Sequence, residues 1–288
     1  MTRPVVGFVG LGNMGAALAA NLVAQGFDVV AYDTAGPQRA PDGSTVAAAV
    51  GEVARRAEVV VLSLPNGAAA SSVVDEIVGV AAGERRTTHV VDTSTIGVAG
   101  AQGLDALLAE HGIAYVDAPV SGGVAGAKAR TLMVMYAAPD DACAAVEGVL
   151  HGMTDRVRRV ADRPGSAQAM KLANNFLSAT ALAATSEAIA FGQSVGLDMA
   201  TMLDVLNASS GQSAATADKF PNHVLTERYA SGFACGLMAK DVQLYLDAVA
   251  EQGAPAVLGS VTTTVWQQFA AADPTADFTR IFTFVQHS

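Results

Sequence analysis

A glycine-rich turn near the N-terminus constrains the fold of this chain more than any other stretch. Residues 5–9 are apolar and typical of a buried strand, and residues 14–25 follow a helical period. Between these segments, Gly10, Gly12 and Gly15 have the spacing GxGxxG. The first glycine of such a turn permits a tight bend, the second lets a pyrophosphate approach the backbone, and the third lets the helix lie close to the strand. This stretch therefore predicts a phosphate site at a helix N-terminus.

An acidic residue follows the next predicted strand, residues 28–32. Asp33 lies roughly 20 residues after the glycines, where a carboxylate binds the 2′-hydroxyl of the adenosine ribose in a dinucleotide site. The order strand, glycines, helix, strand and aspartate thus predicts that the chain binds NAD. A carboxylate repels the 2′-phosphate of NADP, but Arg39 is close enough in the chain to soften that preference, so NADP stays possible.

The composition limits the classes of partner and the compartment. The formal net charge of −10 in 288 residues argues against nucleic acid and against an anionic membrane surface. No uninterrupted apolar run approaches the ~18 residues of a membrane span, and residues 1–4 leave no room for a secretory signal before the first strand. Cys143 and Cys235 are too few for a disulfide framework or a zinc site. We therefore expect a cytoplasmic protein without a bound metal, in which both cysteines are small buried side chains.

Predicted strands and helices alternate through the first half of the chain. The further strands are expected at residues 58–64, 88–92, 113–116 and 131–137, and the helices at 46–56, 68–80, 98–110 and 140–150. This alternation predicts an α/β Rossmann domain with a doubly wound, mostly parallel sheet. Beyond it we expect only helices, at residues 166–195, 199–208, 214–224, 237–252 and 254–272. The predicted organisation is a dinucleotide-binding domain at residues 1–162 and an all-helical domain for substrate and oligomerisation at 163–288, joined by the long helix.

Polar or glycine-rich segments follow three of the predicted strands. Ligands of doubly wound sheets bind outside the carboxyl ends of the strands, so residues 64–66, 93–95 and 119–123 should line one crevice. On the long helix, Lys171 and Asn175 are four residues apart and project from one face. Among apolar neighbours, this pair is either a surface lysine with a structural amide, or a site in which a desolvated lysine acts as general acid or base. The spacing leaves both interpretations open.

Four motifs, in order, resemble the β-hydroxyacid dehydrogenase family over nearly the whole chain. They are residues 7–15, residues 117–132 with Asp-Ala-Pro-Val-Ser-Gly-Gly at their start, residues 165–175, and residues 233–241 with Phe-Ala-Cys-Gly-Leu-Met-Ala-Lys-Asp. The resemblance implies a nicotinamide-dependent, metal-free oxidation of a small 3-hydroxy carboxylic acid by hydride transfer. In such an enzyme the cofactor carries the redox chemistry and the protein positions the substrate.

The resemblance also implies roles for the residues of the two helical motifs. Lys171 matches the family's catalytic lysine, which takes the hydroxyl proton as the hydride leaves. Asn175 matches an amide that orients the substrate, with Asn174 as its weaker neighbour. Lys240 matches a lysine that closes over substrate and cofactor, unless it is a solvated helix lysine paired with Asp241.

In the glycine-rich motif, Ser121, Gly122 and Gly123 would bind the substrate carboxylate through a hydroxyl and backbone N–H groups, unless they form only a glycine turn. A larger set of residues is implied to lie against the cofactor. These are Gly10, Leu11, Gly12, Asn13, Met14, Asp33, Leu64, Pro65, Thr95 and Lys240, with Ser94 as a weaker candidate.

Two positions depart from the family pattern. Arg130 stands where the family commonly has a small residue, often glycine, and Ala167 replaces a more usual glycine. The alanine is harmless or mildly stabilising in a helix. The arginine either points into the cleft, where it would bind a second anionic group of the substrate, or points outward as a surface arginine.

The resemblance favours 3-hydroxyisobutyrate as substrate, because Asp33 favours NAD and the C-terminal half looks most like that subgroup. The alternatives are tartronate semialdehyde reduction and the oxidation of L-threonate or another 3-hydroxyacid. An imine reductase, or an NADH-binding protein without turnover, is less favoured because Lys171 and Asn175 are both present. The alanine-rich helices offer more apolar surface than one small domain buries, which predicts a homodimer or homotetramer.

Overall fold

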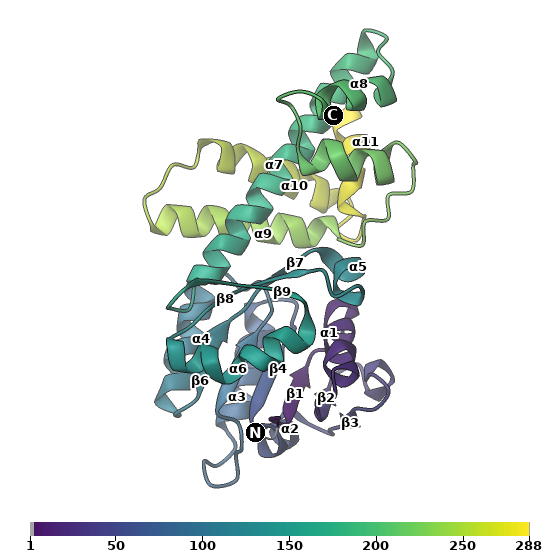
Figure 1. Cartoon of the computed structure of the whole chain (residues 1–288). Helices are drawn as coiled ribbons and strands as arrows, with labels where there is room; N and C mark the ends of the chain where they lie inside the picture. Colours follow the sequence, from purple (N-terminus) through teal and green to yellow (C-terminus); the bar gives the residue numbers. More distant parts are fainter. Residues whose placement is uncertain (1–2, 288) are drawn as a thin grey trace. The chain divides into compact units, whose positions relative to one another are not determined.

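The computed structural model describes residues 3–287 of the chain. The chain divides into two compact units within helix α7 (Ser166–Ser194), one ending at Lys171 and the other beginning at Leu172. We call the first the sheet unit and the second the helical unit. Strands coloured purple to teal belong to the first, and green and yellow helices to the second (Figure 1). The domain boundary expected near residue 162 stays a prediction.

The sheet unit is built on one sheet whose strands run in the order β3-β2-β1-β4-β5-β6-β8-β7, with β9 paired to β8. The strands are β1 (Val6–Val9), β2 (Val29–Tyr32), β3 (Thr45–Val46), β4 (Val59–Leu62), β5 (His89–Asp92), β6 (Ala114–Asp117), β7 (Val120–Ser121), β8 (Met133–Ala137) and β9 (Arg156–Ala161). Neighbours from β3 through β6 are parallel, β8 is antiparallel to β6 and β7, and β9 is parallel to β8. The predicted doubly wound, mostly parallel sheet is therefore confirmed.

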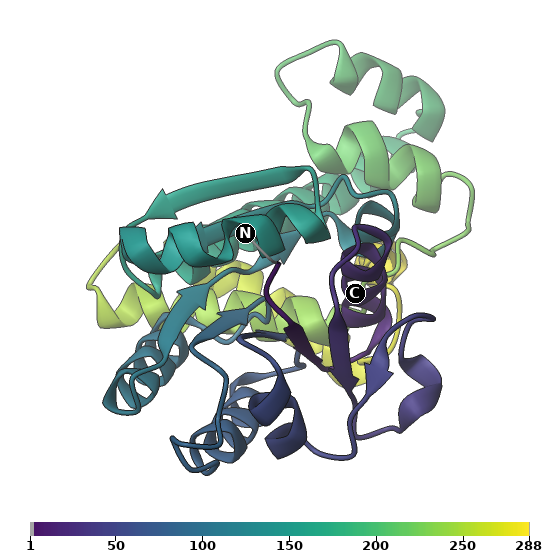
Figure 2. The ribbon, with the colours of Figure 1, turned by 60° about the horizontal axis from the view of Figure 1, so that its bottom comes forward.

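Helices cover both faces of this sheet, as the turned view in Figure 2 shows. One apolar core lies between the strands and α1 (Asn13–Ala24), α5 (Gly123–Lys128) and α6 (Asp140–Met153). A second core lies between the strands and α2 (Val50–Arg56), α3 (Gly67–Val78) and α4 (Val98–Glu110). Successive strand residues alternate between the cores, so Phe8 belongs to the first and Val9 to the second.

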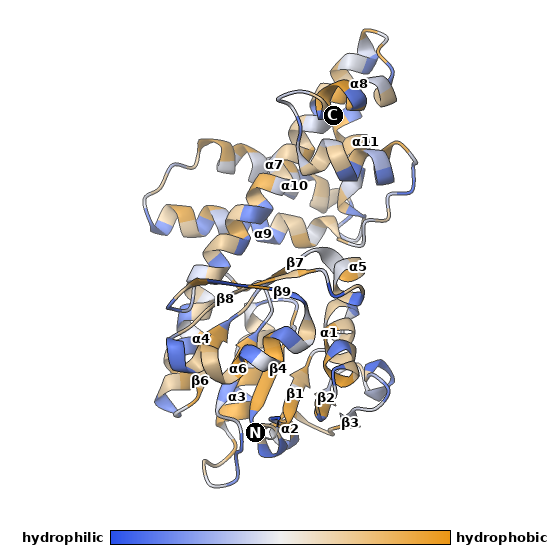
Figure 3. Cartoon of the chain, viewed as in Figure 1, coloured by the Kyte–Doolittle hydropathy of each residue, from blue (hydrophilic) through white to orange (hydrophobic). Residues whose placement is uncertain are grey.

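Strands buried on both faces are apolar throughout, and this is why β1 and β4 were predictable from the sequence. Both are hydrophobic along their length in Figure 3, whereas β9 carries hydrophilic residues. In β9, Arg156, Arg158 and Arg159 are exposed, and the strand pairs only with β8. The sequence pattern predicted no strand there, because charged residues typical of a protected sheet edge hide the apolar alternation.

The remaining differences from the predicted elements are local. The helix expected at residues 46–56 begins only at Val50, because Thr45 and Val46 pair with β2. The short strand β7 and the one-and-a-half-turn helix α5 were not predicted, since neither is long enough to show a period. Cys143 and Cys235 are free and buried, as expected.

The helical unit contains, after most of α7, helices α8 (Met199–Asn207), η2 (Ala215–Val224), α9 (Cys235–Glu251), α10 (Val257–Ala272), η3 (Phe278–Arg280) and α11 (Ile281–Gln286). Within its described residues it has no strand ladder, only an isolated bridge between Ala234 and Asp277, so the all-helical prediction is confirmed. Segment η2 is a π-helix in which Leu225 N–H donates to Phe220 O; Pro221 inside it has no N–H to donate. The core surrounds Trp266, and none of the helices in the described part of the chain has the length and apolarity to span a membrane.

Candidate active site

The phosphate turn contains three glycines that are needed for different reasons. Gly10 has a φ of 94°, and a Cβ atom there would lie 2.4 Å from the backbone oxygen of Ser63. A Cβ atom on Gly15 would lie 1.9 Å from the oxygen of Gly10, so only glycine lets α1 begin this close to β1. Gly12 precedes α1, and a Cβ atom there would meet no atom within 4 Å. Two glycines thus close the turn, and the third leaves open backbone beside the helix N-terminus, as a bound pyrophosphate requires.

The carboxylate of Asp33 is fixed at the end of β2. Its Oδ2 accepts from the N–H of Leu11 at 2.5 Å, and its Oδ1 accepts from the N–H of Ala35 at 2.7 Å. A cavity of about 440 Å³ opens beside it, and its lining includes Leu11, Tyr32, Asp33, Pro37 and Val46. Asn13 and Met14 form the start of α1, with Asn13 exposed and Met14 half-buried. The turn, the carboxylate and the cavity together fit the adenosine half of a dinucleotide.

The segments that follow β4 and β5 are tied to each other. The N–H of Leu64 donates to Ser94 Oγ at 2.8 Å, and the N–H of Ser94 donates to Asp92 Oδ1 at 2.9 Å. Pro65 is exposed and Thr95 is half-buried. The structure therefore brings Leu64 and Ser94 together at the sheet edge where ligands of this fold bind. That these residues contact the cofactor stays a prediction.

Asp92 is a fully buried acid at the end of β5. The hydroxyl of Tyr115 donates to its Oδ2 at 3.2 Å. Burial raises the pKa of Asp92 to about 6, although hydrogen bonds from Ser94 act in the opposite direction. Burial, together with the negative charge of Asp92, raises the pKa of Tyr115 well above its usual value.

A second buried acid, Asp117, ends β6, and sequence reasoning assigned it no role. Gln168 Nε2 donates to Asp117 Oδ1 at 2.8 Å, and both side chains are fully buried. Burial raises the pKa of Asp117, while hydrogen bonds from Gln168 and Gly165 lower it. The one signal in the sequence was a glutamine three residues before Lys171.

The Ser121–Gly122–Gly123 segment lies where β7 ends and α5 begins. Ser121 pairs with Met133 of β8 and is half-buried. Gly122 has a φ of 133° and Gly123 a φ of 68°, a backbone that side chains would strain. The two glycines are therefore required by the turn itself, and carboxylate binding at this segment stays a prediction.

Lys171 and Asn175 lie one turn apart on α7, as predicted, at the division between the two units. Lys171 is 7% exposed and Asn175 is 5% exposed. Such burial argues against the solvated surface lysine that the spacing had left open. That Lys171 acts as general acid or base stays a prediction.

In the helical unit, Asp241 joins two of the predicted site residues. Asn175 Nδ2 donates to Asp241 Oδ2 at 2.6 Å, and Lys240 Nζ lies 3.0 Å from Asp241 Oδ1. The Lys240–Asp241 pair considered from the sequence is therefore present, but the Lys240 side chain is only 27% exposed and the Asp241 side chain 4%. Exposed Asn174 donates to Asn175 Oδ1 at 3.1 Å, which fixes the orientation of the Asn175 amide. Sequence reasoning missed the positioning contact of Asp241, for which only adjacency to Lys240 gave a hint.

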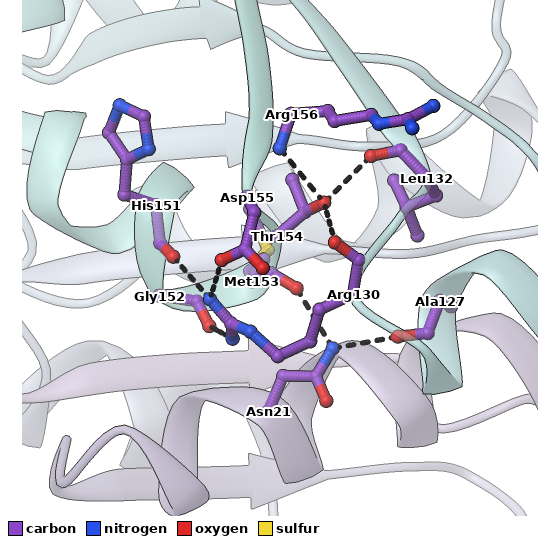
Figure 4. A network of polar contacts seen from close by, with 10 residues as sticks. All are labelled: Asn21, Ala127, Arg130, Leu132, His151, Gly152, Met153, Thr154, Asp155 and Arg156. Atoms are coloured by element: carbon purple, nitrogen blue, oxygen red, sulfur yellow. Dashed lines mark hydrogen bonds and ion pairs between the residues drawn. The ribbon is translucent and has the colours of Figure 1, made fainter.

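Arg130 caps the end of α6 (Figure 4). Its guanidinium donates to His151 O at 2.9 Å, to Gly152 O at 2.6 Å and to Asp155 Oδ1 at 2.8 Å. These carbonyls belong to the last turn of α6, where helix oxygens lack internal partners and a cation is favoured. Arg130 has a φ of 58°, a left-handed backbone that glycine adopts more readily than arginine. Of the two alternatives, the cleft orientation is wrong.

Comparisons with known proteins match the chain from end to end. Residues 5–161 match the family model described as the NAD-binding domain of 6-phosphogluconate dehydrogenase. Residues 165–285 match the model described as NAD-binding of NADP-dependent 3-hydroxyisobutyrate dehydrogenase.

Individual relatives agree with these models. A probable 3-hydroxyisobutyrate dehydrogenase of Mycobacterium tuberculosis is 34% identical over 285 residues, 96% of each protein. The 2-(hydroxymethyl)glutarate dehydrogenase of Eubacterium barkeri is 32% identical over 91% of this chain and 88% of its own. Among solved structures, the Mycobacterium tuberculosis 3-hydroxyisobutyrate dehydrogenase with L-serine has a TM-score of 0.91 at 33% identity, over 99% of each chain. Similarity of this extent, over both units, shows that the protein is an NAD(P)-dependent dehydrogenase of the β-hydroxyacid dehydrogenase family.

Proposed function

We propose that the protein oxidises 3-hydroxyisobutyrate to its semialdehyde, with NAD as the preferred acceptor. The observation that carries the proposal is the full-length similarity to proteins named 3-hydroxyisobutyrate dehydrogenase, at 34% identity over 96% of the chain. The 2-(hydroxymethyl)glutarate dehydrogenase is almost as similar. Its named substrate has two carboxylates, and Arg130, which would have bound the second one, is engaged at the end of α6. A substrate with one carboxylate is therefore favoured.

In the proposed mechanism, Lys171 Nζ takes the proton of the substrate hydroxyl. A nicotinamide cofactor held by the phosphate turn and Asp33 would supply the redox chemistry, as acceptor of the hydride. The Ser121 hydroxyl and the N–H groups of Gly122 and Gly123 bind the substrate carboxylate, since charge-assisted hydrogen bonds to a carboxylate are strong. Asn175 fixes the orientation of the substrate, so that the hydroxyl faces the lysine. In the reverse direction, the ammonium of Lys171 returns the proton to the carbonyl oxygen.

Asp241 supports this arrangement from the helical unit. Its carboxylate accepts from the Asn175 amide and lies beside the Lys240 ammonium. In the proposed site, the half-buried Lys240 offsets the acidic chain for two anionic ligands. Asp33, held by two backbone N–H groups, binds the ribose hydroxyls and disfavours the 2′-phosphate of NADP.

Initial-rate measurement of cofactor reduction near pH 9 tests the proposal. The panel contains 3-hydroxyisobutyrate, glycerate, L-threonate, serine and 2-(hydroxymethyl)glutarate, each with NAD⁺ and with NADP⁺. We expect the highest kcat/KM for 3-hydroxyisobutyrate with NAD⁺. A higher value for L-threonate or glycerate would select the corresponding alternative activity. No reduction with any member of the panel, in a protein that still binds NADH, would contradict hydroxyacid oxidation and favour an imine reductase or a sensor.

We also infer that the protein is a homodimer or homotetramer. The support is a set of exposed apolar side chains in the helical unit, namely Leu177, Phe191, Val195, Val257, Leu258 and Val261, which are 61–80% exposed. Exposed apolar side chains that gather into a large patch mark an interaction site, and a second copy of the chain is the commonest partner in soluble oligomers. Light scattering after size exclusion would measure the mass, and a mass near 29.2 kDa would contradict the inference. The cytoplasmic location stays a prediction.

A further inference from the structure

The side chain of Gln168 is held by four hydrogen bonds at the carboxyl edge of the sheet. Its Oε1 accepts from the N–H groups of Ile96 at 2.9 Å and Gly97 at 3.1 Å. Its Nε2 donates to Ser94 O at 3.0 Å and to Asp117 Oδ1 at 2.8 Å. A primary amide has two N–H donors and an oxygen with two lone pairs, so this group uses its full capacity. Only one orientation of the amide satisfies these four partners.

Asp117 holds the beginning of the same helix from a different strand. Its Oδ2 accepts from the N–H of Gly165 at 2.9 Å and from the N–H of Gln168 at 3.0 Å. Helix α7 begins at Ser166, so these are N–H groups that the helix itself leaves without partners. A carboxylate at this end is also favoured by the helix dipole. Asp117 therefore caps α7 although it is 48 residues away from Gly165 in the chain.

These contacts define where the first turn of α7 lies against the sheet, and not only that the segment is helical. Apolar side chains alone would allow α7 to slide or rotate by small amounts at little cost, whereas directional hydrogen bonds to β5 and β6 define one position of its first turn. Lys171 follows Gln168 by three residues, which is about one helical turn. The same network reaches Leu64, because Ser94 Oγ accepts from its N–H. The lysine and the segments after β4 and β5 thus belong to one rigid framework inside the sheet unit.

A buried network of this kind is an inefficient source of folding stability. A buried carboxylate loses its hydration, and a well-packed apolar group of similar volume is often as stabilising or more so. A buried polar network of this kind is better explained by a role in holding neighbouring residues in one geometry. Displacement of a reacting group by about 1 Å can cost about 100-fold in rate, which makes such a geometry valuable.

We propose that Gln168 and Asp117 are positioning residues for proton transfer, which hold the first turn of α7 against β5 and β6 and thereby place Lys171. The proposal rests on the proposed function, in that Lys171 is the group that accepts the substrate proton. Neither side chain touches the substrate; both act through the position of the lysine.

Exchanging the amide of Gln168 and the carboxylate of Asp117 tests the proposal. Gln168→Glu keeps the shape but places a carboxylate oxygen against Ser94 O and Asp117 Oδ1, and Asp117→Asn removes the charge that caps α7. We expect each single variant to lower kcat by about 10- to 100-fold, with the Kd for NADH within about threefold of the parent. In the double variant Asp117→Asn/Gln168→Glu, the amide and the carboxylate trade places and the bond between them can form again. We therefore expect the double variant to recover at least part of the loss in kcat.

A second readout reports the lysine directly. The chain has only four lysines, Lys128, Lys171, Lys219 and Lys240, so the signals of ¹³C-methylated lysines can be assigned by single Lys→Arg variants. We expect the titration of Lys171 to shift in Gln168→Glu and Asp117→Asn, and that of Lys219 to stay unchanged. Matched controls are Gln102→Glu and Asp75→Asn, which change the same side-chain types at exposed positions of α4 and α3.

The results of these experiments distinguish failure of the positioning proposal from failure of the proposed function. If Lys171→Ala abolishes turnover while Gln168→Glu and Asp117→Asn keep the parental kcat and the parental Lys171 titration, the positioning proposal is wrong and the function stands. If Lys171→Ala keeps the parental kcat, the proposed function itself is wrong. Equal losses of kcat and NADH affinity, without recovery in the double variant, would show a merely structural role and overturn the proposal. Should Gln168→Glu fail to fold, Asp117→Asn and the double variant carry the same test.

Discussion

The two units of this protein satisfy their buried carboxylates in opposite ways. In the sheet unit, Asp92 and Asp117 accept from backbone N–H groups, from the Tyr115 hydroxyl and from the Gln168 amide. In the helical unit, Asp241 accepts from a side-chain amide and lies 3.0 Å from the ammonium of Lys240. The difference arises because the sheet edge and the helices provide different hydrogen-bond donors to a buried carboxylate.

Loops at the end of parallel strands leave N–H groups that no secondary structure consumes. The N–H groups of Ser94 and Gly165 are of this kind, and they stabilise negative charge without a counter-ion. Inside a helix, the N–H groups are already bonded to carbonyls one turn earlier. Asp241 lies within α9 and Asn175 within α7, so only side chains can satisfy the buried carboxylate there. The sheet edge thus surrounds its buried carboxylates with fixed, uncharged donors, and the helical unit pairs its buried carboxylate with an ammonium.

The largest expected effect comes from removing Lys171, the residue that the sheet-edge contacts are proposed to position. Lys171→Ala should lower kcat by ~10²–10⁴-fold, the usual contribution of general acid–base catalysis, and should leave NADH binding almost unchanged. Steady-state kinetics and NADH fluorescence titration measure the two quantities. Lys219→Ala, which removes a lysine paired with Asp218 in the helical unit, is the control and should retain the parental kcat. Parental kcat in Lys171→Ala would remove the lysine from the mechanism.

A second prediction concerns Asp92, whose hydrogen-bond donors are uncharged. Its folded-state pKa, about 6, lies above the usual value of 3.8, so the folded protein holds this proton more tightly than the unfolded chain does. The associated stability is complete below the unfolded pKa and is lost as the pH rises through about 6. An asparagine side chain cannot ionise, so Asp92→Asn should gain stability relative to the parent as the pH rises from 5 to 8, by on the order of 1 kcal/mol.

Urea unfolding of Asp92→Asn and its parent at pH 5 and pH 8 provides the measurement. Exposed Asp75 gives the matched control, because Asp75→Asn makes the same substitution at an exposed position of α3. A difference between Asp92→Asn and the parent that does not vary with pH would mean that Asp92 titrates in the folded protein as it does in the unfolded chain.

The third prediction removes the paired charge of the helical unit. Asp241→Ala leaves the Lys240 ammonium and the Asn175 amide without their buried partner, and should lower the free energy of unfolding by about 2 kcal/mol. Asp241→Asn keeps an acceptor for Asn175 and should cost less. Asp247→Asn, an exposed change on the same helix, serves as control. Equal unfolding free energies for Asp241→Ala and the parent would show that the pair contributes nothing to stability.

The smallest expected effect concerns Arg130, a cation of the sheet unit whose acidic partner, Asp155, is exposed. Arg130→Ala loses the bonds to the end of α6 but keeps the left-handed backbone, so it should destabilise by about 1–2 kcal/mol. Arg130→Gly loses the same bonds and relieves the backbone, so it should be less destabilised, by about 1 kcal/mol. Thermal unfolding ranks the two variants. The order of substrates in the panel should be the same for both, and a change in that order would reopen a role for Arg130 in substrate binding.

Local patterns along the sequence determined much of this protein. The apolar run, glycines and Asp33 predicted β1, the phosphate turn and the end of β2, because each depends on residues that are neighbours in the chain or one turn apart. The 29-residue helix α7 was predicted to within one residue, since its sequence lacks proline and its single glycine, Gly192, lies in the last turn. The pairing of Lys171 with Asn175 on one face followed from the helical period alone.

Contacts between distant residues were decided only by the tertiary structure. Gln168 and Ile96 are 72 residues apart, and Asn175 and Asp241 are 66 apart, so no local period links them. The direction of Arg130 depended on where the end of α6 lies, and strand β9 on an edge beside β8. Periodicity records which face of an element is buried. Which polar groups meet on the buried side depends on the order of the strands and the packing of the helices, and therefore on the whole fold.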